Sequence, residues 1–343
     1  MDLRIDALRK SMGEKSAYIT SKANIFYYSG FTSEDAYLII TPARAILVTD
    51  SRYTVQAKEQ AAGFEIFDIK ENIPFEEKTV LIEEEHITAG RLERLKKKYP
   101  DKEFIRGDEI ISRARRIKTG EEIGLIRTAQ EIGDAAFTHI LDFLKPGISE
   151  KSVALELEYF MKKNGAQGLS FETIAASGIR SAMPHGAASD KIIEKGDFLT
   201  LDFGCVYKGY CSDMTRTVVI GTASERQREI YNIVLKAQEA ALSAIAAGKR
   251  CADTDAAARD IIKAHGYGEY FGHGLGHSVG IEIHELPSFS PKSEDILENG
   301  HVITVEPGIY IENFGGVRIE DLIVVSDGKA MNLTHSPKNL IEI

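Results

Sequence analysis

Two stretches far apart in the sequence have nearly the same pattern. Each runs from a glycine through an apolar, strand-like segment to a carboxylate: Gly196-Asp-Phe-Leu-Thr-Leu-Asp202 and Gly300-His-Val-Ile-Thr-Val-Glu306. In each case the chain then returns to a second acid, Asp213 or Glu320, in another apolar segment. Four convergent carboxylates repel one another and lose hydration when they are buried. The pattern therefore predicts a site in which two divalent cations compensate the negative charge.

The helical pattern is duplicated with the same spacing. Apolar residues at three- and four-residue steps predict a helix over 120–145, and a second helix follows over 149–165. A capping box opens the next helix, over 224–248, and a shorter helix ends at Gly266. The two helix pairs are offset by about 104 residues, as are the first acids of the two strand segments. We therefore predict a pseudo-twofold domain at 113–343, with one sheet at its core and the helices outside.

Hairpin geometry places the first two acids. If Lys208-Gly209 forms a two-residue turn, Asp202 lies opposite Thr215. Asp213 then lies one diagonal step away, and because side chains alternate along a strand, the two acids share one face.

The second hairpin needs a different turn. The separation of Glu306 and Glu320 is even, so a common face requires an odd loop or a bulge near 313–316. Pro307 cannot donate to a ladder, so we expect the strand to lose its regular pairing after Glu306.

Residues 1–112 alternate strand-like and helical stretches, which is typical of a small α/β domain. The strand-like runs are 16–20, 36–40, 45–49, 65–69 and 80–82, and the helical stretches are 3–12, 51–62 and 87–99. The predicted fold class is thus α/β (α+β), with a smaller N-terminal domain at 1–112 and the duplicated domain at 113–343. The basic run 113–118 between them is interpreted as a solvated linker.

Composition excludes several classes of function. A net charge of −10 and a pI near 5.5 argue against nucleic-acid binding, which needs Lys and Arg gathered on one face. No apolar run approaches the length of about eighteen residues that spans a membrane, and the N-terminus lacks the apolar core of a signal peptide. We therefore expect a cytoplasmic protein without nucleic-acid or membrane partners. The cysteines, which form no C-x-x-C pair, are not expected to form disulfides.

Glycine-rich segments contain four histidines: His185, His273, His277 and His284. The glycines around His273 and His277 argue against a helix, so their spacing is not that of the helical H-E-x-x-H zinc motif. One imidazole among four carboxylates provides mostly hard oxygen ligands, which suit manganese, cobalt or iron and permit bridging. We expect two divalent cations about 3.5–4 Å apart, manganese or cobalt, with zinc or iron as alternatives.

At these residues the chain closely resembles the pita-bread metallopeptidases, the group that contains methionine aminopeptidase, aminopeptidase P and Xaa-Pro dipeptidase (prolidase). The resemblance covers essentially all of 113–343. It rests on five motifs in order: Leu-Asp202-Phe-Gly, Ser-Asp213-Met-Thr-Arg, Gly-His277-Ser-Val-Gly, Glu306-Pro-Gly-Ile-Tyr and Arg-Ile-Glu320-Asp. The N-terminal segments Asn24-Ile-Phe-Tyr-Tyr-Ser-Gly-Phe-Thr and Asp50-Ser-Arg-Tyr53 look like the extra domain of the proline-specific branch, of creatinase/prolidase type. The resemblance implies a curved, mainly antiparallel sheet with outer helices.

The resemblance also implies a dinuclear centre with five metal ligands: Asp202, Asp213, His277, Glu306 and Glu320. Asp213 and Glu320 would bridge the two ions, with Asp202 on one ion and His277 and Glu306 on the other. Two dications would acidify a bridging water, and Glu306 would carry its proton to the leaving nitrogen.

Other residues match the proline-specific members. By this likeness, His284 should contact the scissile carbonyl oxygen, and His185 should lie near the leaving group. His273, Tyr310 and Arg318 also match. Arg318 would clamp a substrate carboxylate or brace Tyr310 and the ligands, and the alternative is an ordinary ion pair with Glu320 or Asp321.

The implied activity is hydrolysis of the bond before proline in Xaa-Pro dipeptides, so the expected partner is a small peptide with proline at its second position. The compact length and the run His284-Glu285-Leu-Pro favour a dipeptidase over an aminopeptidase P that acts on longer peptides. A non-catalytic binding module is the more distant alternative, because such relatives have lost ligands that this chain retains. We also expect a homodimer.

Overall fold

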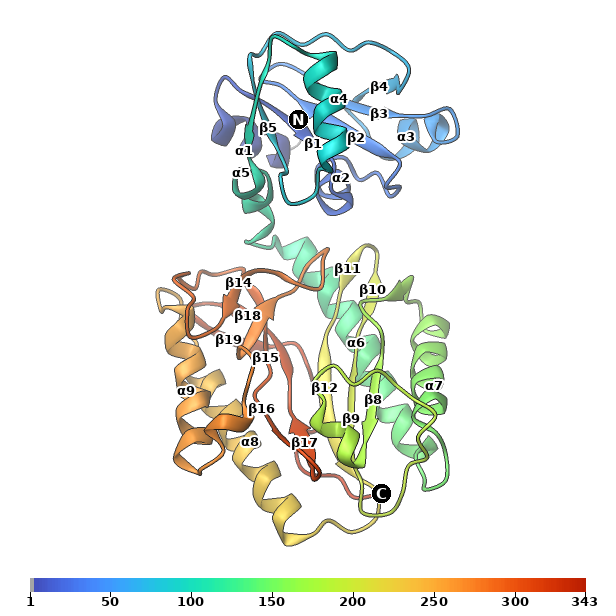
Figure 1. The fold of residues 1–343 in the computed structure, drawn as a ribbon, viewed down its shortest axis with the longest axis vertical. Coiled ribbons are helices and arrows are strands. Elements are labelled where there is room, and N and C mark those ends of the chain that lie inside the picture. Colours follow the sequence, from blue (N-terminus) through green and yellow to red (C-terminus); the bar gives the residue numbers. More distant parts are fainter. Residues whose placement is uncertain (1–2) are drawn as a thin grey trace. The chain divides into compact units, whose positions relative to one another are not determined.

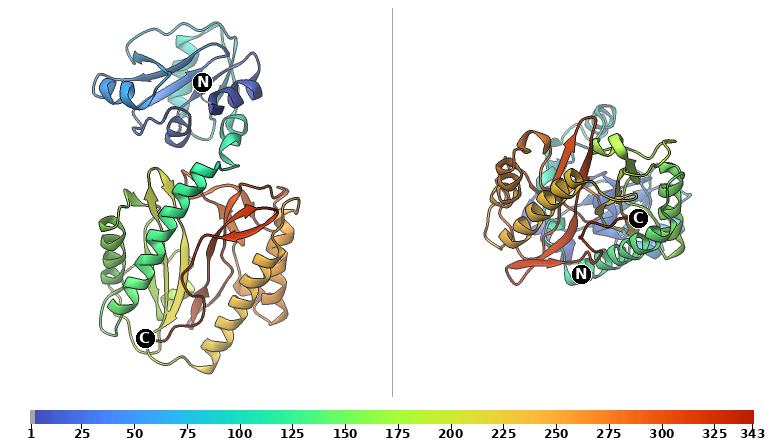
Figure 2. Two further views of the ribbon diagram at one scale, coloured as in Figure 1. Left: turned by 180° about the vertical axis from the view of Figure 1, so that it is seen from behind. Right: turned by 90° about the horizontal axis from the view of Figure 1, so that it is seen from below.

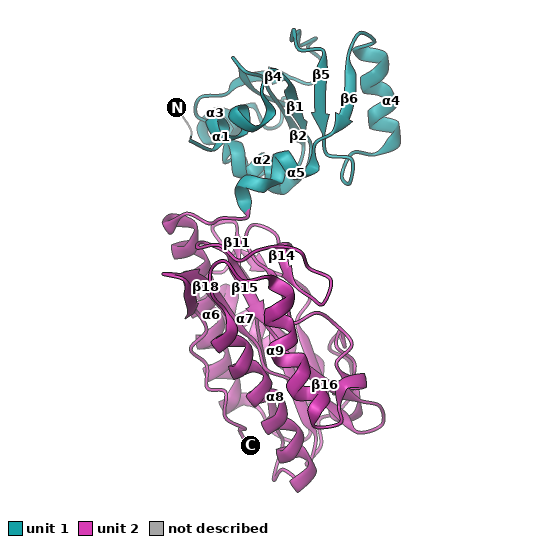
Figure 3. Cartoon of the chain, turned by 90° about the vertical axis from the view of Figure 1, so that its left-hand side faces the viewer, with its two compact units in different colours: residues 1–115 teal, residues 116–343 magenta. Residues whose placement is uncertain are grey.

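The computed structural model describes residues 3–343. The chain divides into two compact units, with the boundary between Arg115 and Arg116 (Figure 3). Unit 1 and unit 2 each enclose hydrophobic cores of their own.

Unit 1 is built around a mixed sheet with the strand order β4-β3-β2-β1-β5-β6. Its strands are β1 (Ser16–Ile19), β2 (Ala36–Ile40), β3 (Ala45–Thr49), β4 (Glu65–Asp68), β5 (Thr79–Ile82) and β6 (Glu103–Arg106). Its helices are α1 (Leu3–Met12), α2 (Lys22–Ser29), α3 (Thr54–Gln60), α4 (Ala89–Lys98) and α5 (Asp108–Ser112). The predicted α/β character is confirmed, although β6, α2 and α5 were not predicted.

Helix α2 is set by its ends and not by its composition. Residues 25–28 are β-branched or aromatic and favour a strand. However, the Ser21 side chain accepts a hydrogen bond from the backbone N–H of Asn24, and Gly30 ends the helix with a φ of 73°. The buried carboxylate of Glu83 accepts further bonds from the side chains of Ser21 and Asn24. Tertiary hydrogen bonds thus override the local preference.

The basic run 113–118 is not a solvated linker. Arg115 is buried in unit 1 and donates to the side-chain oxygen of Asn24 at 2.9 Å. Lys118 is buried in unit 2 and donates to Glu285 at 3.1 Å. The linker interpretation is wrong for these two residues because each cation has a fixed acceptor far away in the sequence, which the charge pattern cannot show.

Helices α6 (Gly120–Phe143), α7 (Glu150–Lys163), α8 (Glu225–Ala244) and α9 (Cys251–Ala264) lie outside the strands of unit 2 (Figure 1). The view from behind shows α6 and α8 running across one face of these strands (Figure 2). The predicted capping box of Ser224 and Gln227 opens α8, and Thr119 forms a second capping box with Glu122. Within residues 3–343, no helix combines the length and the apolar character that a membrane span requires.

The strands of unit 2 form antiparallel sheets with the orders β11-β10-β7, β12-β9-β8, β14-β13-β15-β18-β19 and β16-β17. Their bounds are β7 (Gly168–Leu169), β8 (Ile174–Ser177), β9 (Phe198–Phe203), β10 (Cys205–Tyr207), β11 (Tyr210–Cys211), β12 (Met214–Val219), β13 (Gly276–Ser278), β14 (Glu285–Phe289), β15 (Val302–Val305), β16 (Gly308–Ile311), β17 (Gly315–Arg318), β18 (Asp321–Ser326) and β19 (Lys329–Asn332). The antiparallel character is confirmed. The expectation of one sheet was too simple, because the ladders are interrupted at Asp213, Glu306 and Glu320.

The first hairpin has the predicted register. Lys208 and Gly209 both have positive φ, 46° and 85°, as a two-residue hairpin turn requires. Thr215 pairs with Asp202, so Asp213 is the diagonal neighbour of Asp202.

The second hairpin turns through the three residues 312–314, since Ile311 pairs with Gly315. Of the two alternatives predicted for this turn, an odd loop or a bulge, the structure has the odd loop. The same register continues on both sides of Pro307, which places Glu306 directly opposite Glu320. The ladder is interrupted at 306–307, as predicted from the proline.

Glu150, the first residue of α7, provides a test of the packing. Its fully buried carboxylate accepts hydrogen bonds from Ser177, Arg180 and Ser189. Burial raises the pKa of Glu150, but these bonds outweigh it and hold the pKa below its usual value. We expect Glu150→Gln to lower the free energy of unfolding by about 2–4 kcal/mol at pH 7, measured by urea denaturation, because the new amide N–H groups face other donors.

The matched control is Glu158→Gln on the same helix, which should change stability by less than about 0.5 kcal/mol. A depressed pKa stabilises the fold only above the pKa of the unfolded chain. The difference between wild type and Glu150→Gln should therefore shrink as the pH falls from the usual glutamate pKa through the lower folded pKa of Glu150. Equal stability of the two proteins at pH 7 would contradict the role of Glu150.

Candidate metal centre and active site

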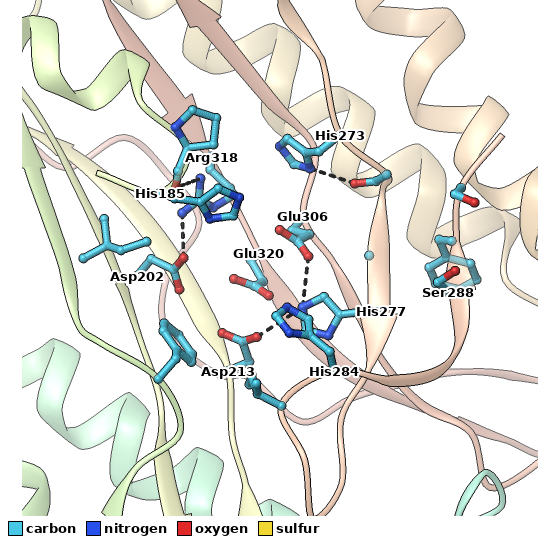
Figure 4. Close-up of a pocket in the computed structure, with 18 of the residues that line it drawn as sticks. His185, Asp202, Asp213, His273, His277, His284, Ser288, Glu306, Arg318 and Glu320 are labelled. Carbon is cyan, nitrogen blue, oxygen red and sulfur yellow. Dashed lines mark hydrogen bonds and ion pairs between the residues drawn. The ribbon is translucent and has the colours of Figure 1, made fainter. Parts of the chain in front are cut away.

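A cavity of about 550 Å³ in unit 2 brings the predicted site residues together (Figure 4). Its lining includes the four acids, four histidines and one arginine: Asp202, Asp213, Glu306, Glu320, His185, His273, His277, His284 and Arg318. Apolar side chains from other segments complete the wall: Phe171, Ile174, Ile283 and Phe289. Tyr310 is not part of the lining, but its hydroxyl contacts two residues that are.

The four acids point into one space although they come from two hairpins (Figure 4). Asp202 lies in β9, whereas Asp213, Glu306 and Glu320 occupy short breaks between strands. Three of these acids come closest: Asp202, Asp213 and Glu320 each have one carboxylate oxygen within 4.8 Å of an oxygen of the other two. Oδ1 of Asp202 and Oε1 of Glu320 are buried and meet no hydrogen-bond donor among residues 3–343. Buried oxygens without donors need another partner, which a cation can provide.

Burial disfavours the charged form of these acids. It raises the pKa values of Asp213 and Glu320 well above their usual range, and the neighbouring carboxylates add to this effect. Burial also raises the pKa of Glu306 to about 7, although Arg318 opposes the shift. Without cations, the cluster therefore retains protons near neutral pH.

His277 completes the donor set. Its Nε2 lies 3.6 Å from Oδ2 of Asp213 and 3.4 Å from Oε1 of Glu306. Burial is the main cause that lowers the pKa of His277, so the ring is neutral at pH 7 and has a lone pair for a metal. The ring of His284 packs edge-on against it, with the ring centroids 4.3 Å apart.

Arg318 connects the acids to a second group of polar side chains. Its guanidinium donates to Asp202 at 2.6 Å and to the hydroxyl of Tyr310 at 2.8 Å. That hydroxyl also lies 2.9 Å from Nε2 of His273. Burial raises the pKa of Tyr310 to about 12, so the hydroxyl keeps its proton. The ion-pair partner of Arg318 is thus Asp202, and not Glu320 or Asp321 as in the alternative considered from the sequence.

Two threonines that the sequence analysis missed hold the acids. The hydroxyl of Thr215 donates to Glu320 at 2.6 Å, and that of Thr304 donates to Glu306 at 3.1 Å. A signal for Thr304 exists in the repeat, because Thr200 and Thr304 both stand two positions before an acid. Residues two apart on a strand share a face, so a threonine there can reach the same site as the acid.

Oxygen-rich donors, one neutral imidazole and buried oxygens without donors together fit divalent cations. The fold and the site therefore define a metal-dependent enzyme with a carboxylate-rich centre. Residues 124–327 match the metallopeptidase family M24, and residues 4–117 match the creatinase/prolidase N-terminal domain. The chain belongs to metallopeptidase family M24.

Relatives of this chain match it over nearly its full length. A Xaa-Pro dipeptidase from Bacillus anthracis is 44% identical, with a TM-score of 0.95 and 99% of both chains covered. An X-Pro aminopeptidase from Thermotoga maritima is 39% identical, with a TM-score of 0.90 over 98% of this chain and 99% of that one. A Xaa-Pro dipeptidase from Pyrococcus furiosus is 43% identical over 99% of this chain and all of the relative.

The raised pKa values predict that cations replace protons in the site. We expect Mn²⁺ to release protons on binding at pH 7, measured by calorimetry in buffers of different ionisation enthalpy. The metal-free protein should lose stability, on the order of 2–3 kcal/mol, as the pH rises from about 5 to 8. The sign follows from the raised pKa values: between the unfolded and folded pKa, the folded chain binds more protons than the unfolded chain does.

Thermal midpoints at several pH values, with chelator or with Mn²⁺, measure this effect. The metal-loaded protein should have a higher midpoint that depends less on pH, because the cations have taken the place of the protons. The electrostatic account of the site would be wrong if the metal-free midpoint did not fall over this range and Mn²⁺ released no protons.

Proposed function

We propose that this M24 metallopeptidase hydrolyses the peptide bond that precedes proline, with Xaa-Pro dipeptides as its substrates. The observation that carries the proposal is the convergence of Asp202, Asp213, Glu306, Glu320 and His277 in one pocket. The Xaa-Pro dipeptidases that resemble the chain over nearly its full length support the substrate. We assign the N-terminal part, predicted as 1–112, as the domain of creatinase/prolidase type and the rest, predicted as 113–343, as the catalytic domain; the compact units divide three residues later, after Arg115.

The five convergent residues would hold two divalent cations. Asp213 and Glu320 are proposed as the shared ligands, which is supported by their burial and by the neighbouring acids, both of which raise the pKa of each. Asp202 would bind on one side, and His277 and Glu306 on the other. When bound, such cations acidify water and polarise a peptide carbonyl. Because the donors are mostly carboxylate oxygens, we propose manganese or cobalt.

Glu306 is proposed to move the proton. This role is supported by burial, which raises the pKa of Glu306 to about 7 in the metal-free chain and so allows both the charged and the neutral carboxyl near pH 7. Thr304 donates to Oε1 of Glu306 and so fixes the rotamer of the carboxyl group. Glu306 can therefore accept a proton from the attacking water and deliver it to the leaving nitrogen of proline.

The remaining polar residues would bind the substrate. His284 and His185 both line the pocket, where we propose that His284 donates to the scissile carbonyl oxygen and that His185 lies beside the leaving group. His273 and Tyr310 would steady Arg318 through the shared hydroxyl. Arg318 donates to Asp202, and its other N–H groups meet Thr215, Tyr310 and the carbonyl of Pro184, so we propose that it braces the metal ligand.

A dipeptidase and an aminopeptidase differ in the length of the peptides that they cleave. The relative from Thermotoga maritima is an X-Pro aminopeptidase. We expect the manganese-loaded protein to cleave Xaa-Pro dipeptides with a kcat/KM at least about tenfold above that for Xaa-Pro tripeptides, measured by proline release and chromatography. A preference for the tripeptides would favour the aminopeptidase. Inactivity on both, with manganese or cobalt, would contradict the proposed function.

The proton-carrier role predicts the effect of Glu306→Gln. We expect turnover to fall by about 10²–10⁴-fold, because the amide cannot carry the proton. The metal-free thermal midpoint should not decrease, since the change removes one of the repelling carboxylates. The matched control is Glu312→Gln at the exposed turn of the same hairpin, which should leave turnover unchanged. Metal content must be measured alongside, and near-normal turnover of Glu306→Gln would refute the role.

A further inference from the structure

A buried acid, Glu285, anchors the loop that carries His284. Residues 279–284 connect β13 to β14, and Ile283 and His284 of this loop line the pocket. The carboxylate of Glu285 accepts hydrogen bonds from the backbone N–H groups of Ile281, at 3.1 Å, and Glu282, at 3.2 Å. These bonds tie the start of the loop to the residue that follows His284. The conformation of the loop therefore depends on where the Glu285 carboxylate is held.

The space around this carboxylate is closed. A Cβ atom at position 280 would lie 2.6 Å from an oxygen of Glu285, so the glycine is required for the carboxylate to fit against the loop. The backbone N–H of Gly280 donates to the carbonyl of Glu282, and its carbonyl accepts from Cys211. The loop is thus fixed both to itself and to the first hairpin.

Lys118 holds the other side of the carboxylate. Its Nζ lies 3.1 Å from Oε2 of Glu285, and the two side chains are only 2% and 5% exposed. The backbone of Lys118 is itself fixed, because its N–H donates to the carbonyl of Gly300 at 2.9 Å. A buried ion pair gains little stability over a well-packed apolar pair, since both charges lose their hydration. Such a pair does fix geometry, because neither charge can move without losing its partner.

We propose that Lys118 and Glu285 are positioning residues that orient His284 towards the substrate. The proposal rests on the function proposed above, in which His284 donates to the scissile carbonyl oxygen. Glu285 acts through His284 and does not itself line the pocket. The ion pair therefore sets the direction of the imidazole, and its loss should affect the chemical step more than substrate binding.

The kinetic test uses the manganese-loaded full chain and a Xaa-Pro dipeptide. We expect Glu285→Gln and Lys118→Met each to lower kcat by about 10–100-fold, because a small misplacement of a catalytic group has an effect of this size. KM should change by less than about threefold. Lys118→Arg, which keeps the charge, should recover at least part of the activity. The control is Arg116→Met, which breaks the neighbouring ion pair with Asp295 and should leave kcat unchanged.

A double variant separates positioning from a general structural role. In a His284→Ala background, Glu285→Gln should cause no further loss of kcat, because the residue through which it acts is already absent. A loss of the same factor in both backgrounds would overturn the proposal, as would an unchanged kcat in Glu285→Gln. If Glu285→Gln fails to fold, Lys118→Met in the two backgrounds provides the same comparison.

Histidine ring NMR spectra of the metal-free protein provide a readout that does not depend on activity. The ring signals of His284, assigned with His284→Ala, should shift or broaden in Lys118→Met, whereas those of the distant His139 and His335 should not. Unchanged His284 signals would overturn the proposal. If the wild-type protein cleaves no Xaa-Pro peptide, the proposed function fails, and this spectrum still decides whether the ion pair orients His284.

Discussion

Repulsion among four carboxylates is the constraint on which the structure of unit 2 depends. The two hairpins must hold these acids close together although burial raises the pKa values of Asp213, Glu306 and Glu320. The backbone provides much of the restraint, because the N–H of Glu320 donates to the carbonyl of Thr215 and joins the second hairpin to the first. The acids are therefore fixed before any cation binds, which is the preorganisation that a metal site requires.

Strand alternation gives two consecutive acids opposite environments. Glu320 points into the pocket, where burial and nearby acids raise its pKa. Asp321 points to the other side and pairs with the buried Arg216 at 2.8 Å and with Lys338 at 2.9 Å. Burial alone would raise the pKa of Asp321, but these two cations keep it below its usual value. Glu320 is thus placed to bind a cation. Asp321 is ionised, and its ion pair with Arg216 joins the two hairpins.

The duplicated hairpins provide the four carboxylates of the site but not its histidines. The two hairpins differ in turn length, so Asp202 and Asp213 are diagonal neighbours, whereas Glu306 and Glu320 lie directly opposite each other. His277 has no counterpart, because the position 104 residues earlier is Thr173. The repeated strands thus provide symmetric oxygen donors, and the unrepeated glycine-rich segments add the imidazoles that make the pocket chemically asymmetric.

Features that depend on residues close together in the chain, such as turns, strand alternation and helix caps, could be predicted from the sequence. Turn residues and side-chain alternation predicted the register of the first hairpin and the need for an odd loop or a bulge in the second. The serine cap predicted the start of α8. Only the tertiary structure decided that Lys118 is buried against Glu285, that Arg318 pairs with Asp202 and that Thr215 reaches Glu320. Those contacts join residues more than a hundred positions apart, and no local pattern records which groups meet or how far water is excluded from them.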